Sequence, residues 1–65
     1  MLIKVNGQER DVPEGTNILG LLESFKLTPE KVAVELNRRL VRTAKYGEAL
    51  KGGDEVEIVT FVGGG

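Results

Sequence analysis

The chain has 65 residues, of which 9 are basic and 10 acidic, and its formal net charge at neutral pH is −1. A chain of this length forms one small domain that buries only about 60% of the surface exposed by its unfolded form. A deep cleft between subdomains is therefore excluded, and a stand-alone enzyme is disfavoured. The balanced charge and the scarcity of aromatic residues (two Phe, one Tyr, no Trp) argue against a nucleic-acid partner.

Cysteine and histidine are both missing from the sequence. No disulfide can support the core, and neither a thiolate nor an imidazole can bind a metal, so no metal site is expected. The usual general base and the strongest nucleophile of proteins are absent too, so no catalytic side chain is expected. No apolar run approaches the roughly 18 residues of a membrane span, and the first ten residues lack the layout of a signal peptide. We therefore expect a cytoplasmic protein with no membrane partner.

The first 12 residues predict a β-hairpin. Residues 2–6 (LIKVN) alternate apolar and polar side chains, which is typical of a strand with one buried face. Asn6–Gly7 suits a two-residue type I′ turn. Residues 8–12 (QERDV) then return as a largely polar edge strand.

A helix is predicted next, with Thr16 or Asn17 as its N-cap. Its apolar side chains follow the spacing of one helical stripe, namely Ile18, Leu21, Leu22 and Phe25. Gly20 inside this helix costs roughly 1 kcal/mol relative to Ala, and we expect it to permit close packing against a sheet. Residues 28–31 (TPEK) predict a short turn with Pro at its first position.

Three more strands are predicted in the second half of the chain: 32–37 (VAVELN), the short Leu40–Arg42, and 55–62 (EVEIVTFV). The last of these is the strongest, because it is rich in β-branched residues. Residues 43–50 predict a loop that could include one helical turn, with Leu50 anchoring it to the core.

The predicted fold class is α+β, with the element order β-β-α-β-β-β. One helix with one apolar stripe can cover one face of one sheet, and Val56 and Ile58 of the last strand would face it. Central placement of that strand, parallel to the first, gives a mixed sheet of four to five strands on one main helix. This is the layout of the ubiquitin-like β-grasp. We assign residues 1–62 to the domain and 63–65 to a flexible glycine tail.

The opposite face of the last strand is a candidate docking surface. Strand periodicity places Val59 and Phe61 on the face away from the helix. Together with Val62 they would form an exposed apolar patch for partner docking beside the tail. Two alternatives stay open: segment 43–50 covers the patch, or the patch is ordinary scattered apolar surface.

Two charged groups are weaker candidates. Basic side chains gather in one part of the sequence, and they could steer an acidic partner or simply form a solvated turn: Arg38, Arg39, Arg42 and Lys45. Glu55 and Glu57 share a strand face like a catalytic carboxylate pair, but without a pocket we interpret them as a solvated face.

The sequence as a whole resembles the ThiS family, the sulfur carrier proteins of thiamine biosynthesis. The similar segments are VNG at 5–7, VAVELN at 32–37, LKGGDEVEIV at 50–59 and the final VGGG at 62–65. The short length also fits. One departure is NRRLVRTAKY at 37–46, where relatives often have a glycine-containing turn and a VPR-like segment.

The resemblance implies a carrier rather than an enzyme. An E1-like adenylyltransferase of the thiamine pathway would adenylate the carboxylate of Gly65 with ATP, so that no cofactor is bound by the carrier itself. A sulfur donor protein such as a cysteine desulfurase would then yield a thiocarboxylate, and thiazole synthase would move the sulfur into the thiazole ring. Gly63 and Gly64 would thread the tail into the partners' active sites, because glycine has no β-carbon and three extended residues reach about 10 Å.

Three other readings of the sequence stay open. The small subunit of molybdopterin synthase is a similar sulfur carrier with a different acceptor. A ubiquitin-like protein modifier would join Gly65 to a lysine. A non-carrier β-grasp binding module would make the glycines an incidental tail.

Overall fold

The computed structural model describes residues 1–61. Four residues lie outside the described part of the chain: Val62, Gly63, Gly64 and Gly65. The predicted boundary between the domain and the glycine tail falls among them, so it stays a prediction.

The chain opens with the predicted hairpin. Strand β1 (Leu2–Val5) pairs antiparallel with β2 (Gln8–Asp11). Asn6 and Gly7 adopt φ angles of 50° and 82°, and positive φ at both central residues is what a type I′ turn requires. The hairpin and its turn are thus confirmed.

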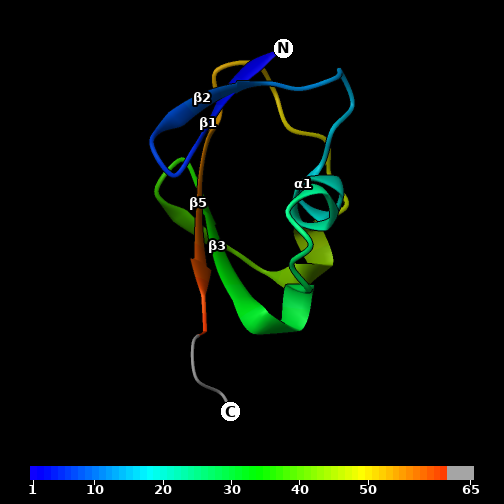
Figure 1. Cartoon of the computed structure of the whole chain (residues 1–65), viewed down its shortest axis with the longest axis vertical. Helices are drawn as coiled ribbons and strands as arrows, with labels where there is room; N and C mark the ends of the chain where they lie inside the picture. The colour runs from blue at the N-terminus through cyan, green and yellow to red at the C-terminus, as the bar shows by residue number, and fades with distance from the viewer. Residues whose placement is uncertain (62–65) are drawn as a thin grey trace.

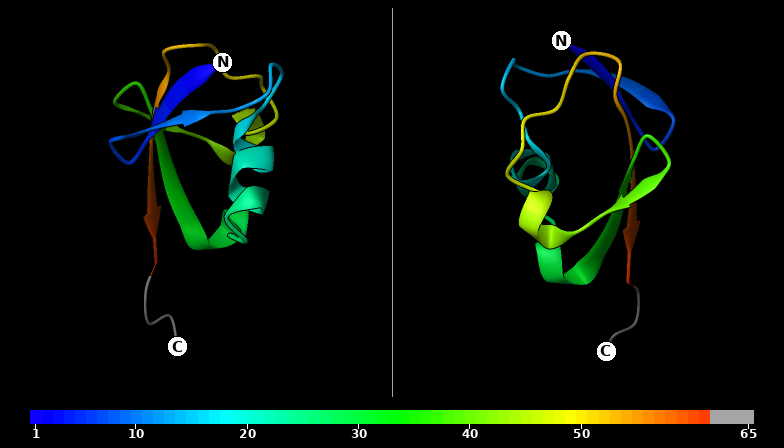
Figure 2. Two further views of the ribbon diagram at one scale, coloured as in Figure 1. Left: turned by 45° about the horizontal axis from the view of Figure 1, so that its top comes forward. Right: turned by 180° about the vertical axis from the view of Figure 1, so that it is seen from behind.

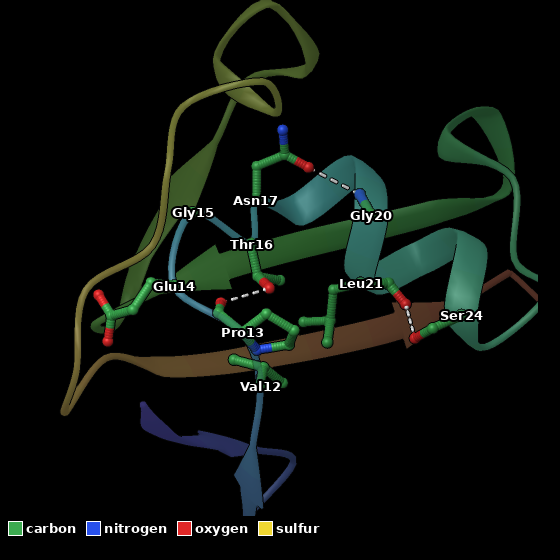
Figure 3. Close-up of a pocket in the computed structure, with 9 residues that line it drawn as sticks. All are labelled: Val12, Pro13, Glu14, Gly15, Thr16, Asn17, Gly20, Leu21 and Ser24. Atoms are coloured by element: carbon green, nitrogen blue, oxygen red, sulfur yellow. Dashed lines mark hydrogen bonds between the residues drawn. The ribbon is translucent and has the colours of Figure 1, made fainter.

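Helix α1 (Ile18–Ser24) begins at one of the two predicted caps. The Asn17 side-chain oxygen accepts a hydrogen bond of 2.7 Å from the Gly20 backbone N–H (Figure 3). Thr16 instead donates its hydroxyl to the Pro13 carbonyl at 2.7 Å. Asn17 is therefore the N-cap, and Thr16 stabilises the loop before it.

The predicted apolar stripe of α1 faces the core, but the prediction for Gly20 is wrong. Ile18, Leu21 and Leu22 are buried, while Phe25 is half-buried where the helix ends. Gly20 is exposed, and a β-carbon there would meet the Asn17 side-chain oxygen at 3.3 Å instead of the sheet. The reason is helical geometry, since Gly20 lies about 200° around the helix from Ile18.

The remaining elements follow the predicted order with shifted ends: a 3-10 turn at Pro29–Lys31, β3 (Val32–Leu36), β4 (Arg39–Val41), a 3-10 turn at Thr43–Lys45, and β5 (Glu55–Thr60). The turn before β4 uses Asn37 and Arg38, whose φ angles are 52° and 71°. Strand β4 therefore starts one residue earlier than predicted. Strand β5 ends at Thr60, before the predicted end at residue 62.

The five strands form one mixed sheet in the order β2-β1-β5-β3-β4 (Figure 1). The last strand lies in the centre, parallel to β1 and antiparallel to β3. This topology, with α1 against one face, confirms the β-grasp prediction.

The hydrophobic core lies on the face of the sheet that α1 covers. Figure 2 shows α1 and the segment that follows β4 on the same side of the sheet. Tyr46 and Leu50 of this segment are buried, and the Leu50 N–H donates to the Thr16 carbonyl at 2.8 Å. The predicted anchoring by Leu50 is confirmed. The buried apolar set is Ile3, Val5, Ile18, Leu21, Leu22, Val32, Val34, Tyr46, Leu50, Val56 and Ile58.

Candidate functional site

The candidate site is the end of β5, from which the chain runs on to the glycines. The register of β3 on β5 extends from Leu36↔Val56 to Val32↔Thr60. One more hydrogen bond follows, from the Phe61 N–H to the Lys31 carbonyl at 2.9 Å. The sheet therefore holds the backbone up to Phe61, which is the last described residue.

Two asparagine side chains hold β5 in place. The Asn6 amide bridges both backbone groups of Ile58, accepting from its N–H at 2.7 Å and donating to its carbonyl at 3.3 Å. On the other edge, the Asn37 side chain accepts from the Glu55 N–H at 2.9 Å and donates to the Asp54 carboxylate at 3.1 Å. The Asn6 amide thus imitates a peptide group of a neighbouring strand, whereas the Asn37 amide links the start of β5 to the Asp54 side chain.

Sequence reasoning missed this role of the two asparagines. Both occupy turn positions with positive φ, where Asn is tolerated better than most residues with a side chain. That preference was visible in VNG and ELN, but the partners of the side chains were not. They lie 52 positions away for Asn6 and 18 positions away for the Asn37–Glu55 bond.

The face of the sheet away from α1 is open around the end of β5. Val59 is 59% exposed and Phe61 is 60% exposed. The first alternative for this patch is ruled out, because residues 43–50 pack on the helix side, where Tyr46 is only 2% exposed. The structure leaves Val59 and Phe61 accessible, and their docking role stays a prediction. Val62, the third predicted member, lies outside the described residues.

The same open face carries an exposed leucine that sequence reasoning missed. Leu40 in β4 is 71% exposed. Its partner across the sheet is Glu35, which in turn lies opposite Glu57 of β5. Ala33 lies opposite Val59 one row further along. The open face therefore combines apolar side chains with facing carboxylates.

Other predicted groups are not brought together into a reactive site. Arg38, Arg39, Arg42 and Lys45 are all exposed, and only Lys45 forms an ion pair within residues 1–61, at 3.5 Å to Glu48. Glu55 and Glu57 are exposed on β5. In the described part of the chain, no three His, Cys, Asp or Glu side chains are grouped closely enough to hold a metal ion.

A cavity of about 450 Å³ lies between the loop before α1 and the helix itself (Figure 3). Glu14 is exposed at its rim, and its other polar side chains are already engaged locally. Thr16 donates to Pro13, Ser24 donates to the Leu21 carbonyl at 2.6 Å, and Asn17 caps the helix. These groups stabilise the loop and the helix and show no arrangement for catalysis.

The helices within residues 1–61 lack the length and apolar character needed to cross a membrane.

Comparison with known proteins places this geometry in a family. The sequence model described as the ThiS family matches residues 3–65. The crystal structure of a thiamine biosynthesis protein (ThiS) from Geobacter metallireducens superposes with a TM-score of 0.81 at 36% identity, covering 100% of both chains. These matches confirm the resemblance seen in the sequence.

Two relatives named thiazole synthase also match. The protein from Magnetococcus marinus is 42% identical and that from Paramagnetospirillum magneticum is 38% identical, each over 66 aligned positions that cover 100% of this chain. The chain spans about a fifth of the length of these curated relatives, because the match covers 20% of each. In both relatives, the region similar to this chain is therefore part of a longer polypeptide.

Proposed function

Since the chain belongs to the ThiS family, we propose that it is a sulfur carrier of thiamine biosynthesis and that the carboxylate of Gly65 carries the sulfur. The observation that supports this most strongly is the family match, which runs through the final glycines to residue 65. In this proposal the protein is a cosubstrate of its partners, and no side chain of its own performs chemistry.

The proposed chemistry takes place at one carbonyl carbon. A free α-carboxyl group is an anion at neutral pH. In the adenylyltransferase, one of its oxygens attacks the α-phosphorus of ATP, and pyrophosphate leaves. A donor such as a cysteine desulfurase supplies the sulfur as a persulfide, whose outer sulfur attacks the carbonyl carbon and displaces AMP. A thiol then cleaves the S–S bond of the resulting acyl disulfide, which leaves the thiocarboxylate and a new disulfide. Thiazole synthase transfers this sulfur to its substrate, and an oxygen atom from the substrate or from water restores the carboxylate.

The fold supports a tail that enters other proteins. The Phe61–Lys31 backbone bond fixes the last described residue to the sheet. Four residues follow it, and when fully extended they span at most about 14 Å. Glycine has no β-carbon, so Gly63, Gly64 and Gly65 would fit a channel too narrow for larger side chains. The folded domain can then stay outside the partner while its terminus reaches the reacting atoms.

The open sheet face provides a docking surface next to that tail. Val59 and Phe61 expose apolar side chains at the end of the strand that leads into it, and Val62 remains a further proposed contact outside the described residues. Burying such a patch against a partner offsets part of the entropy lost when the tail is ordered. The names of the two thiazole synthase relatives support that enzyme as one partner. The adenylyltransferase and the sulfur donor are proposed as partners because the proposed chemistry requires both.

Intact mass spectrometry tests the proposal. The protein is first isolated from its own cells to establish that Gly65 is its last residue. It is then incubated with ATP, the adenylyltransferase of the thiamine pathway and a sulfide source. We expect a mass gain equal to one oxygen replaced by one sulfur. An unchanged mass, with an adenylyltransferase shown to act on another carrier, would contradict the proposal and direct attention to a molybdopterin-type partner or a binding module.

A further inference from the structure

One edge of the central strand β5 is open beside Thr60, because β1 ends before β5 does. The Asn6 N–H donates to the Val56 carbonyl at 2.9 Å, and the Asn6 side chain takes both backbone groups of Ile58. Strand alternation directs the N–H and the carbonyl of Thr60 to this same side. Thr60 is exposed, and none of the hydrogen bonds formed within residues 1–61 reaches its backbone there.

A groove of about 280 Å³ runs beside this open edge. Ile58, Phe25 and Leu27 give it an apolar lining, and Thr60 itself forms part of the wall. Arg10 crosses from β2, with its guanidinium carbon 4.8 Å from the centre of the Phe25 ring. The volume of the groove is sufficient for one apolar side chain, and an added strand would direct every second side chain to this face of the sheet.

The two outer edges of the sheet are less suited to strand addition. Strand β2 presents only exposed polar or charged side chains along Gln8–Asp11, and β4 has only three residues. Charged and short edge strands discourage pairing with another chain. The β5 edge at Thr60 differs from both, because an apolar groove lies beside it and the tail continues from it.

We propose that this edge of β5 receives an extended segment of thiazole synthase, which adds to the sheet as a short strand beside Thr60 and places one apolar side chain in the groove. The inference rests on the proposed function and deepens it. Five residues separate Thr60 from Gly65 and span at most about 18 Å, so an enzyme acting on Gly65 must lie close to this edge. Strand addition depends on hydrogen bonds to main-chain groups. The glycines of the tail have no side chains and offer main-chain groups alone.

Hydrogen exchange in the unmodified protein tests the pairing directly. In the free carrier, the Thr60 amide should exchange quickly because it faces solvent, whereas the Val59 amide, directed toward β3, should exchange slowly. Binding of thiazole synthase should slow exchange at Thr60 by at least about tenfold, the effect of one added hydrogen bond. Unchanged exchange at Thr60 in a carrier shown to be bound would overturn the inference.

A backbone substitution provides the second test. Chemical synthesis of the 65-residue chain allows the amide of Thr60 to be replaced by an ester, which removes the N–H and keeps the side chain. We expect at most a small loss of thermal stability, because the ester only weakens the Val59 carbonyl as an acceptor, and an affinity for thiazole synthase reduced by about 2- to 10-fold. The matched control is an ester at Phe61, whose N–H donates to Lys31, and which should destabilise the free carrier instead. Unchanged affinity of the Thr60 ester would overturn the inference.

The two proposals fail in different ways. If Gly65 forms the thiocarboxylate and thiazole synthase binds normally while Thr60 stays unprotected, the carrier function stands and the strand addition is wrong. If the unmodified carrier forms no thiocarboxylate and does not bind thiazole synthase, both proposals are overturned.

Discussion

The first part of β5 (residues 55–58) and its last part (residues 59–60), called its first and second halves below, are held differently. In the first half, Glu55 and Ile58 are bridged from opposite edges by the side chains of Asn37 and Asn6, and Val56 is buried in the core. Beyond Ile58, the strand pairs only with the β3 side among the described residues, and Val59 exposes most of its side chain. One strand thus supports the fold with its first half and leaves its second half available to a partner. Substitutions in the first half should therefore lower stability, and substitutions in the second half should affect function and leave stability unchanged.

The largest expected effect is on thiocarboxylate formation and concerns Gly65, which follows both halves of β5 in the sequence. In a protein that ends at Gly65, one alanine added after this residue moves the carboxylate by about 3.5 Å from the position the adenylyltransferase requires. Thiocarboxylate formation should be lost completely, with thermal stability unchanged. Intact mass and a thermal unfolding curve measure the two effects. Gly47→Ala, where an added β-carbon meets open space, is the control and should form the thiocarboxylate normally. Full modification of the extended chain would contradict the prediction.

A matched pair of valines tests the comparison most directly. Val56→Ala removes two methyl groups from a side chain that is 1% exposed, and it should cost about 2 kcal/mol in the free energy of unfolding. Val59→Ala changes an exposed side chain on the same strand and should cost less than about 0.5 kcal/mol. Urea unfolding of both variants gives the two values. Equal losses would show that the two halves of β5 are not held differently.

The asparagine bridge to Ile58 can be removed without changing the turn. Asn6→Gly keeps a residue suited to positive φ but deletes both side-chain hydrogen bonds, which should cost about 1–2 kcal/mol. Urea unfolding measures the loss, and Gln8→Ala, on the other side of the same turn, serves as the control with little expected change. If Asn6→Gly is as stable as the parent protein, the bridge does not hold β5.

A substitution at Phe61, which directly follows β5, should weaken partner binding and leave stability unchanged. Phe61→Ala is expected to weaken partner binding by roughly tenfold, as loss of an aromatic anchor commonly does, with little change in unfolding. Titration calorimetry with thiazole synthase measures the affinity. Leu19→Ala removes another exposed apolar side chain, on the helix, and should leave affinity unchanged. Equal effects of the two variants would contradict a docking role for Phe61.

The smallest effect concerns the facing carboxylates. Like charges directly opposite on adjacent strands are destabilising, so Glu57→Gln should raise stability by about 0.3 kcal/mol by removing repulsion from Glu35. Glu9→Gln gives the opposite control, because Glu9 faces Lys4 and its loss should lower stability slightly. Both differences should shrink at high salt. A stabilising effect of equal size from both variants would indicate a response to net charge alone.

Local structure was largely predictable because it depends on neighbouring residues. The type I′ turn followed from Asn6–Gly7, and the helix followed from its cap and its apolar spacing. The prediction for Gly20 was wrong because the helix was assumed to contact the sheet over more of its surface than the stripe covers. The predicted strands 2–6 and 32–37 were each one residue too long, because Asn6 and Asn37 adopt the positive φ of turn residues.

The candidate site was predictable only in part. Periodicity placed Val59 and Phe61 away from the helix, but it could not say whether another segment covered them. Exposure of Leu40 was missed because its short strand carries too few residues for a periodic pattern. The groove beside Thr60 was also missed, because it is assembled from β2, the end of α1 and β5, which are distant in the sequence.

By itself, the sequence determined the element order, the two candidate helix caps, the hairpin turn and the resemblance to the family, since each depends on local patterns or on segments that relatives share. Only the tertiary structure decided which side of the sheet segment 43–50 covers, which backbone groups the two asparagines bridge and where β1 stops short of β5. Those outcomes depend on contacts between residues tens of positions apart, and such contacts leave no periodic signal in the chain. The open edge of β5 at Thr60 is therefore a property of the assembled sheet.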